Sequence, residues 1–210
     1  MVSILEEAAG TVSPSSFLGH AGGRSILFVP MIREGQSQKN DPRPFDMISL
    51  VRDYRIDRAL LVTHYSLEEE AGAQVGIISD HINLTGRNPL TGRQTDLPDP
   101  GFPDMSQVYS LALQETLRSL LAAYPALRGN SGLLVGIRER QTLSPGERLA
   151  LRATGRCYFS TEGIFEGIVS GAAGVPVVGI VYCAPGAQPW DDRGDAGVLS
   201  LVSEALRKIF

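Results

Sequence analysis

Polar residues that suit an anion stand at the ends of predicted strands in this chain. The tetrapeptide at 19–22, Gly-His-Ala-Gly, precedes a strand predicted over Ser25–Ile32, and Arg33 follows that strand. Ser160 stands at a junction between another predicted strand and a helix. A hydroxyl and main-chain N–H groups at the start of a helix bind anions, and an arginine clamps two oxygens at once. These residues predict a phosphate site that includes His20, although each of them alone also suits a structural role.

Two carboxylates form a second candidate group. Glu162 and Glu166 are four residues apart, so they share one face of the helix predicted after Ser160. If this face lines a ligand site, the carboxylates could bind sugar hydroxyls. The alternative is a solvated helix face.

The histidines and cysteines give no metal pattern. His20, His64 and His81 show no His-x-x-x-His spacing, and no hydrolase triad can be specified from them. Cys157 and Cys183 are far apart in apolar segments, where a free cysteine acts as a small hydrophobe. We therefore expect no metal and no cofactor.

Composition is that of an ordinary globular protein. The 210 residues are 43% hydrophobic and 20% charged, and the net charge of −4 gives no reason to expect nucleic-acid or membrane binding. No leader pattern and no apolar run of about 18 residues is present, which predicts a cytoplasmic protein.

Apolar runs alternate with amphipathic segments along the chain, which is typical of α/β folds. The predicted strands are Ser25–Ile32, Arg58–Thr63, Gln74–Asn83, Leu133–Ile137, Arg156–Ser160 and Val175–Cys183. The predicted helices are Phe45–Tyr54, Ser106–Tyr124, one capped by Ser144 and Glu147, a Gly/Ala-rich one after Ser160, and Val198–Ile209. The proline-rich stretch at 88–103 is predicted as a loop. We expect one domain over 1–210, a three-layer α/β/α sandwich with a mixed central sheet.

Two further blocks of sequence carry a family resemblance. Residues 80–90 are Asp-His-Ile-Asn-Leu-Thr-Gly-Arg-Asn-Pro-Leu, and residues 102–106 are Phe-Pro-Asp-Met-Ser. They closely resemble the signature of purine nucleoside phosphorylases, trimeric enzymes that cleave a nucleoside with phosphate. The tetrapeptides at 19–22 and 158–161 are similar to the family's Gly-His-Ala-Gly and Gly-Met-Ser-Thr. The resemblance implies the nucleoside phosphorylase fold.

The resemblance also implies roles for individual residues. His20, Arg33 and Ser160 match phosphate-binding positions. Phe159 stands where the family has a methionine beneath the sugar and base, beside Tyr158. Nucleoside-binding roles are implied for Tyr158, Phe159, Gln141 and Thr142, and a catalytic role at the departing base for His64.

Several positions depart from the family pattern. The family's first strand and its Gly-Ser-Gly-Leu-Gly phosphate loop have no counterpart, so we expect an N-terminally truncated member. Gln141 replaces a glutamate, residues 64–67 replace the small Asn-Ala-Ala-Gly turn, and Pro185 replaces an asparagine that binds the purine. Losing one donor to a developing charge costs about 10²–10³ in rate, so ordinary activity should be weakened or lost.

Three functions remain open from the sequence. The first is a nucleoside- or base-binding protein with phosphate as co-substrate, a pentosyltransferase if active, in a homotrimer. The second is a non-catalytic ligand-binding or partner subunit in a hetero-oligomer with an active paralogue. The third is a hydrolytic N-glycosidase.

Overall fold

The computed structural model describes most of the chain from residue 51 onward and three short strands before it. The described residues are 3–7, 17–21, 24–28, 51, 53–65, 75–92, 102–125, 127, 129–138, 143–183 and 196–209. Of the predicted helix Phe45–Tyr54, only residues 51, 53 and 54 are described, and they are helical.

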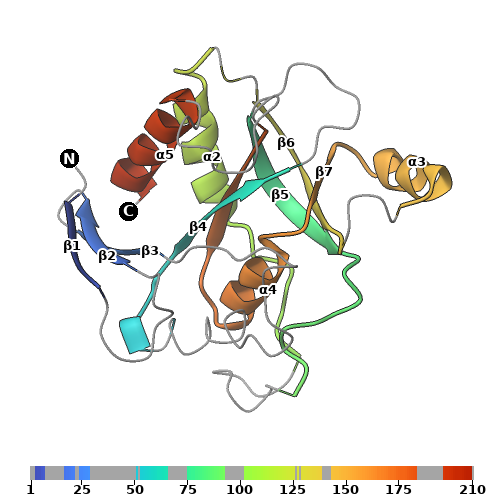
Figure 1. Ribbon diagram of the computed structural model, residues 1–210, viewed down its shortest axis with the longest axis horizontal. Helices are drawn as coiled ribbons and strands as arrows, with labels where there is room; N and C mark the ends of the chain where they lie inside the picture. The colour runs from blue at the N-terminus through green and yellow to red at the C-terminus, as the bar shows by residue number, and fades with distance from the viewer. Residues whose placement is uncertain are drawn as a thin grey trace.

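A five-stranded mixed sheet forms the centre of the molecule (Figure 1). Its strands, in spatial order, are β4 (Ala59–His64), β8 (Val177–Tyr182), β5 (Val75–Asn83), β6 (Gly129–Gly136) and β7 (Cys157–Ser160). β4 runs parallel to β8, β8 antiparallel to β5, and β5, β6 and β7 parallel to one another. The two edge strands, β4 and β7, therefore run in opposite senses.

Helices cover both faces of this sheet. Side chains alternate between the two faces of a strand, so the neighbours Ile77 and Ile78 of β5 belong to hydrophobic clusters on opposite faces of the sheet. Ile78 packs with Ile164 and Val169 of α4 (Ile164–Ala172) on one face. Ile77 packs with residues of α2 (Leu111–Leu121) and α5 (Ala196–Ile209) on the other, where Figure 1 shows these two helices side by side. The predicted three-layer α/β/α architecture is confirmed.

A three-stranded antiparallel sheet precedes the central one. It consists of β1 (Ser3–Glu7), β2 (Phe17–Ala21) and β3 (Arg24–Phe28). Ile26 of β3 packs against Leu206 of α5, which places this sheet beside α5, as Figure 1 shows. Only β3 was predicted. The segments of β1 and β2 contain glycine or glutamate and lack the long apolar run that marks the central strands.

The helix α2 begins five positions later than predicted. The sequence favoured Ser106 as its start, but Tyr109 forms a β-bridge with Val177 and so cannot be helical. Ser110 then caps the helix, and its hydroxyl accepts a hydrogen bond from the Leu113 N–H at 3.4 Å. Pairing with a distant strand overrides local helical periodicity here.

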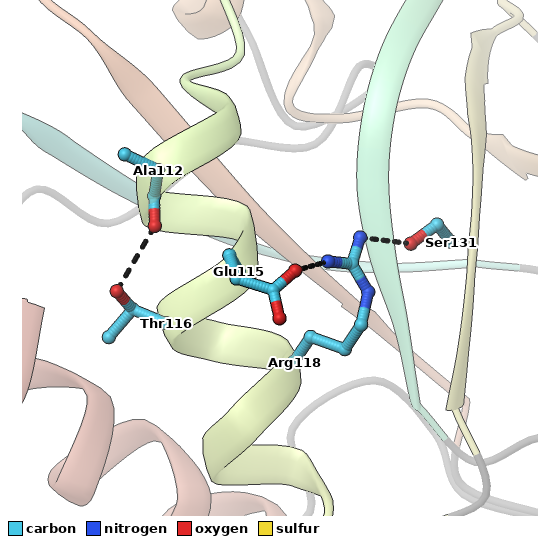
Figure 2. Close-up of polar contacts among 5 residues, drawn as sticks. All are labelled: Ala112, Glu115, Thr116, Arg118 and Ser131. Atoms are coloured by element: carbon cyan, nitrogen blue, oxygen red, sulfur yellow. Dashed lines mark hydrogen bonds and ion pairs between the residues drawn. The ribbon is translucent and has the colours of Figure 1, made fainter.

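Arg118 links α2 to the sheet on the solvent side. Its guanidinium forms an ion pair with Glu115, one turn earlier in α2, and donates to the Ser131 hydroxyl of β6 at 3.4 Å (Figure 2). Both ion-pair partners are exposed, so the contribution to stability is at most about 1 kcal/mol. This contact orients the helix but lies on the outer surface.

The predicted capping box is confirmed at α3 (Pro145–Ala153). The Glu147 carboxylate accepts from the Ser144 N–H at 2.6 Å, and the Ser144 hydroxyl accepts from the Glu147 N–H at 3.2 Å. In the part of the chain that the structure describes, none of the helices has the length and apolar character needed to cross a membrane.

Candidate functional site

The two edge strands of the central sheet meet at Ser160, the last residue of β7. The Ser160 hydroxyl donates to the main-chain carbonyl of His64, at the end of β4, over 2.7 Å. It lies 3.3 Å from the Thr63 hydroxyl and accepts a hydrogen bond from the Glu162 N–H at 3.1 Å. Thr63 and Ser160 are both buried. The sheet is therefore curled, so that its outermost strands touch.

These contacts use the whole hydrogen-bonding capacity of the Ser160 hydroxyl. A serine hydroxyl offers one donor and two acceptor sites. The donor points at the His64 carbonyl, so the proton between the two hydroxyls must come from Thr63. Ser160 thus accepts from Thr63 and from the Glu162 N–H. In this arrangement no donor of Ser160 remains for a phosphate oxygen.

His64 enters the cluster through its main chain and not through its imidazole. Its ring stacks edge-on against Tyr182 of β8, with ring centroids 5.7 Å apart. Tyr182 packs with the hydrophobic cluster beneath α2 and α5. Thr63 precedes His64 in β4, so its side chain lies on the opposite face of the sheet, which α4 covers. The structure brings the His64 carbonyl, but not the His64 ring, to Ser160.

Tyr158 lies in the core on the α4 side. Its side chain is almost fully buried, its hydroxyl donates to the Asn130 carbonyl at 2.6 Å, and its ring makes an edge contact with Tyr65. The ring passes directly over Gly76 and Gly132, where any Cβ would collide with it. Tyr158 thus contributes packing beneath Ser160, two residues along the same face of β7.

Phe159 points to the opposite face of β7 from Ser160. It is buried in a small cluster with Val135 and Ile137, against which Ile82 and Leu143 pack. Leu143 directly precedes α3, so Phe159 joins β6, β7 and the approach to that helix.

The signature at 80–90 comprises the last residues of β5, which pair with β6, and the turn that follows them. The Asn83 side chain accepts from the N–H and hydroxyl of Thr85 at 3.1 and 2.6 Å and donates to the Arg87 carbonyl at 2.8 Å. The Asn88 side chain accepts from the Leu90 N–H at 2.9 Å. These polar side chains bind main chain within the turn, so the motif fixes local geometry at the end of β5.

A carboxyl group lies at the start of α4. Burial raises the pKa of the half-buried Glu166, and the nearby Glu162 raises this pKa further, while hydrogen bonds from the N–H groups of Glu166 and Gly163 oppose the shift. The Glu166 carboxyl thus occupies the first turn of α4. The sequence had paired both glutamates on a ligand-facing or solvated helix face, but Glu166 serves as a partly buried cap.

Three buried polar atoms have no hydrogen-bond partner among the described residues. They are Nδ1 of His81, Oη of Tyr109 and Oγ of Ser170. The His81 and Tyr109 rings meet edge-on at 5.7 Å, and burial lowers the pKa of His81, although Asp80 opposes this shift. Burial also raises the pKa of Tyr109, and the charges of Asp80 and Glu166 add to the effect.

Of the remaining predicted site residues, the structure describes only the main chain of His20. His20 belongs to β2, where its main chain pairs with Ser25 of β3. Arg33, Gln141 and Thr142 lie outside the described residues, and so does Pro185. Within the described ranges, no group of three or more His, Cys, Asp or Glu residues lies close enough together to hold a metal ion.

Sequence reasoning missed Thr63. The only signal was a threonine near the end of an otherwise apolar strand, and such a residue usually finds a buried partner. Which partner it finds depends on the curl of the sheet and could not be read from β4 alone.

Sequence comparison identifies relatives. No protein-family model matches the chain. Purine nucleoside phosphorylase 1 of Geobacillus stearothermophilus is 29% identical over 178 residues, 79% of this chain and 64% of the relative. The purine nucleoside phosphorylase of Mycobacterium tuberculosis is 29% identical over 188 residues, 83% of this chain and 64% of the relative. The chain thus spans about 64% of the length of these curated relatives.

Comparison with solved structures points to the same family of folds as the sequence comparison. A schistosome purine nucleoside phosphorylase in complex with hypoxanthine superposes with a TM-score of 0.72 at 15% identity, covering 99% of this chain and 84% of the other. Isoform 2 from Schistosoma mansoni, in complex with cytosine and ribose-1-phosphate, gives 0.68 at 17% identity, covering 93% and 76%. The family resemblance inferred from the sequence and the nucleoside phosphorylase fold are both confirmed.

Proposed function

We propose, from the premise that this chain is a divergent relative of the purine nucleoside phosphorylases, that it binds a nucleoside or a free base and that its ordinary phosphorolysis is weakened or lost. The observation that carries this proposal is the agreement of sequence relatives and structural neighbours on one family. Solved neighbours hold hypoxanthine, inosine or ribose-1-phosphate, which supports a ligand of nucleoside type.

Weakened phosphorolysis is supported by the hydrogen bonds around Ser160. The reaction needs phosphate to attack the anomeric carbon as the carbon–nitrogen bond breaks and a proton reaches the departing base. Phosphate must be held by donors, yet the Ser160 donor is directed at the His64 carbonyl. A donor is lost outright where Pro185 replaces the family's purine-binding asparagine, and losing one such donor costs about 10²–10³ in rate.

In an active form, residues would take the roles that the family resemblance implies. Phosphate would be held by His20, Arg33 and Ser160. Phe159 would support the sugar and base, with Gln141 and Thr142 at the base edge, whereas Tyr158 would have to leave its core position and its hydrogen bond to the Asn130 carbonyl before it could touch a nucleoside. His64, whose ring makes an edge contact with Tyr182, would serve the departing base.

A non-catalytic role is the second candidate. The Ser160 hydroxyl favours it, because this hydroxyl donates to the His64 carbonyl and would have to turn before it could bind phosphate. In this case the chain would act as a ligand sensor, or as a partner subunit in a hetero-oligomer with an active paralogue. A trimeric assembly and a cytoplasmic location remain parts of the proposal.

Turnover and binding measurements separate the candidates. Purified protein is incubated with inosine, guanosine or adenosine, with and without phosphate, and free base and ribose 1-phosphate are quantified. We expect hypoxanthine or guanine binding by calorimetry with little phosphate-dependent release of base. Phosphate-dependent turnover at rates typical of enzymes would contradict the loss of activity. Release of base without phosphate would indicate a hydrolase, and failure to bind any base or nucleoside would refute the proposal.

A further inference from the structure

Two buried polar atoms without a hydrogen-bond partner belong to side chains that touch, His81 of β5 and Tyr109 before α2. The two rings meet edge-on, with centroids 5.7 Å apart and planes at 68°. Nδ1 of His81 and Oη of Tyr109 are covered and have no partner within the described ranges. A buried polar atom that makes no hydrogen bond is costly and rare in folded proteins, so two of them in contact point to a function.

The two residues stand where two segments part beside β8. β5 pairs with β8 only as far as Ile78, and the register of β5 against β6 shifts between Ile78 and Asp80. Beyond that point Tyr109 takes the place beside β8, where it forms a β-bridge with Val177. The contact between the rings of His81 and Tyr109 therefore joins the end of β5 to the segment that leads into α2.

The surroundings of this contact are tightly packed and mostly apolar. Tyr109 is 5% exposed, and a Cβ at Gly167 of α4 would lie 2.9 Å from its hydroxyl oxygen. The residue of β6 that pairs with His81 is Leu134, which belongs to the hydrophobic core. Such packing has no room for a bound molecule, but the contact can still respond to a proton.

Gaining a proton changes what His81 needs from its surroundings. The neutral imidazole has one N–H and one acceptor nitrogen, whereas the protonated ring donates from both nitrogens and carries a positive charge. Nδ1 has no acceptor in its present position among the described residues. Of the described charged groups, Asp80 favours the protonated ring, and Glu166 of α4 acts on Tyr109. Because Asp80 is exposed, water and its carboxylate would accommodate the charged ring better than the packed contact does.

We propose that the contact between these two rings is an acid-sensitive latch, which holds the end of β5 against the segment before α2 and releases it when His81 gains a proton. Burial lowers the pKa of His81 below its usual 6.5 while the latch is closed, and the charge of Asp80 opposes part of this shift. The stabilisation is therefore complete above pH 6.5 and is lost as the pH falls toward the folded pKa, by up to about tenfold per pH unit for one proton. This inference goes beyond the proposed function and does not depend on the binding of a base.

Native-state hydrogen exchange tests the latch in the unmodified chain. The reporter is the Leu84 N–H, which follows β5 and donates to the Gly136 carbonyl at 2.9 Å, and the N–H groups of α5 are the internal reference. After correction for intrinsic exchange rates, the reporter should exchange about three- to tenfold faster at pH 5.5 than at pH 7.5, relative to α5. An equal acceleration in α5 would mean general acid unfolding and would overturn the inference.

Three substitutions assign the response to His81. His81→Phe keeps a flat ring against Tyr109 but cannot gain a proton, so exchange at Leu84 should change by no more than about twofold between the two pH values. His64→Phe is the matched control, because His64 also makes an edge contact with a tyrosine at 5.7 Å, and this variant should keep the response. Tyr109→Phe should keep it too, since the Tyr109 hydroxyl has no partner to lose among the described residues.

Far-UV circular dichroism and a urea midpoint at pH 7.5 check that each variant folds. If His81→Phe does not fold, His81→Gln replaces it, because glutamine is also uncharged across this pH range. A response confined to the reporter and abolished only by substitution of His81 supports the latch. A response that persists after His81 is replaced, or one that is lost in either control variant, overturns it.

Discussion

The hydroxyl groups of Thr63 and Ser160 lie 3.3 Å apart, although the residues are 97 positions apart in sequence and stand on the two opposite edges of the central sheet. The Ser160 hydroxyl continues the contact to the carbonyl of His64. The carboxyl ends of the edge strands β4 and β7 are thereby joined through the Ser160 side chain, and not by main-chain hydrogen bonds of a β-ladder. The stability of this junction can be measured independently of any ligand.

Ser160→Ala should lower the free energy of unfolding by about 1–3 kcal/mol, because the Glu162 N–H and the His64 carbonyl lose a buried partner. Ser170→Ala is the matched control. Ser170 is also buried, but its hydroxyl has no partner among the described residues, so its loss should be neutral or stabilising. Urea denaturation of both variants gives the comparison. Equal losses would show that Ser160 contributes nothing beyond its volume.

Two buried tyrosines should respond in opposite ways to loss of the hydroxyl. Tyr158→Phe removes a 2.6 Å hydrogen bond to the Asn130 carbonyl and should cost about 1 kcal/mol or more. Tyr109→Phe removes a hydroxyl that has no partner within the described ranges, so it should be neutral or stabilising. Thermal and urea unfolding of the two variants test this difference. A similar loss in both would mean that a water or another group binds Tyr109.

Glu166→Gln should change the pH dependence of stability. Burial raises the pKa of Glu166 above its usual 4.5, so the folded state favours the protonated form. The resulting stabilisation is complete below pH 4.5 and is lost as the pH rises through the folded pKa. Glutamine stays neutral and can still accept the N–H groups at the start of α4. The variant should therefore be more stable than the unmodified chain at neutral pH, on the order of 1 kcal/mol, with the difference vanishing near pH 4. A constant difference from pH 4 to 8 would rule out this account.

Gly163→Ala should destabilise the protein more than Gly174→Ala. Both glycines have positive φ, +86° and +75°, so each substitution brings the left-handed penalty of about 1–2 kcal/mol. Only at Gly163 would the new methyl meet neighbours, with Thr63 Cγ2 at 3.3 Å and a Leu134 methyl carbon at 3.4 Å. The excess loss in Gly163→Ala, measured by chemical denaturation, reports packing at the junction of β4 and α4. No excess would mean that Thr63 has room to move.

Much of the fold followed from local sequence patterns. The apolar runs of β4, β5 and β8 were located to within one or two residues, and the Ser144–Glu147 capping box was predicted in full. Such features depend on residues close in sequence, whose periodicity and side-chain caps act within one element. The turn at the end of the 80–90 signature belongs to the same class, because the side chains of Asn83 and Thr85 bind within it.

Features that depend on contacts between distant segments were not predicted from the sequence. The start of α2 moved because Tyr109 pairs with Val177, and β1 and β2 form only by pairing with each other and with β3. Neither the bridge nor the small sheet has a periodic apolar signal of its own.

The candidate site divides in the same way. The amino-acid sequence by itself determined the family resemblance and the position of Ser160 at a strand-to-helix junction, since both are encoded by contiguous residues. Only the tertiary structure decided that Ser160 meets Thr63, that His64 contributes its carbonyl while its ring rests on Tyr182, and that Glu166 is partly buried. The physical reason is that the order and curl of five strands set which edges touch, and no segment of the chain carries this information alone.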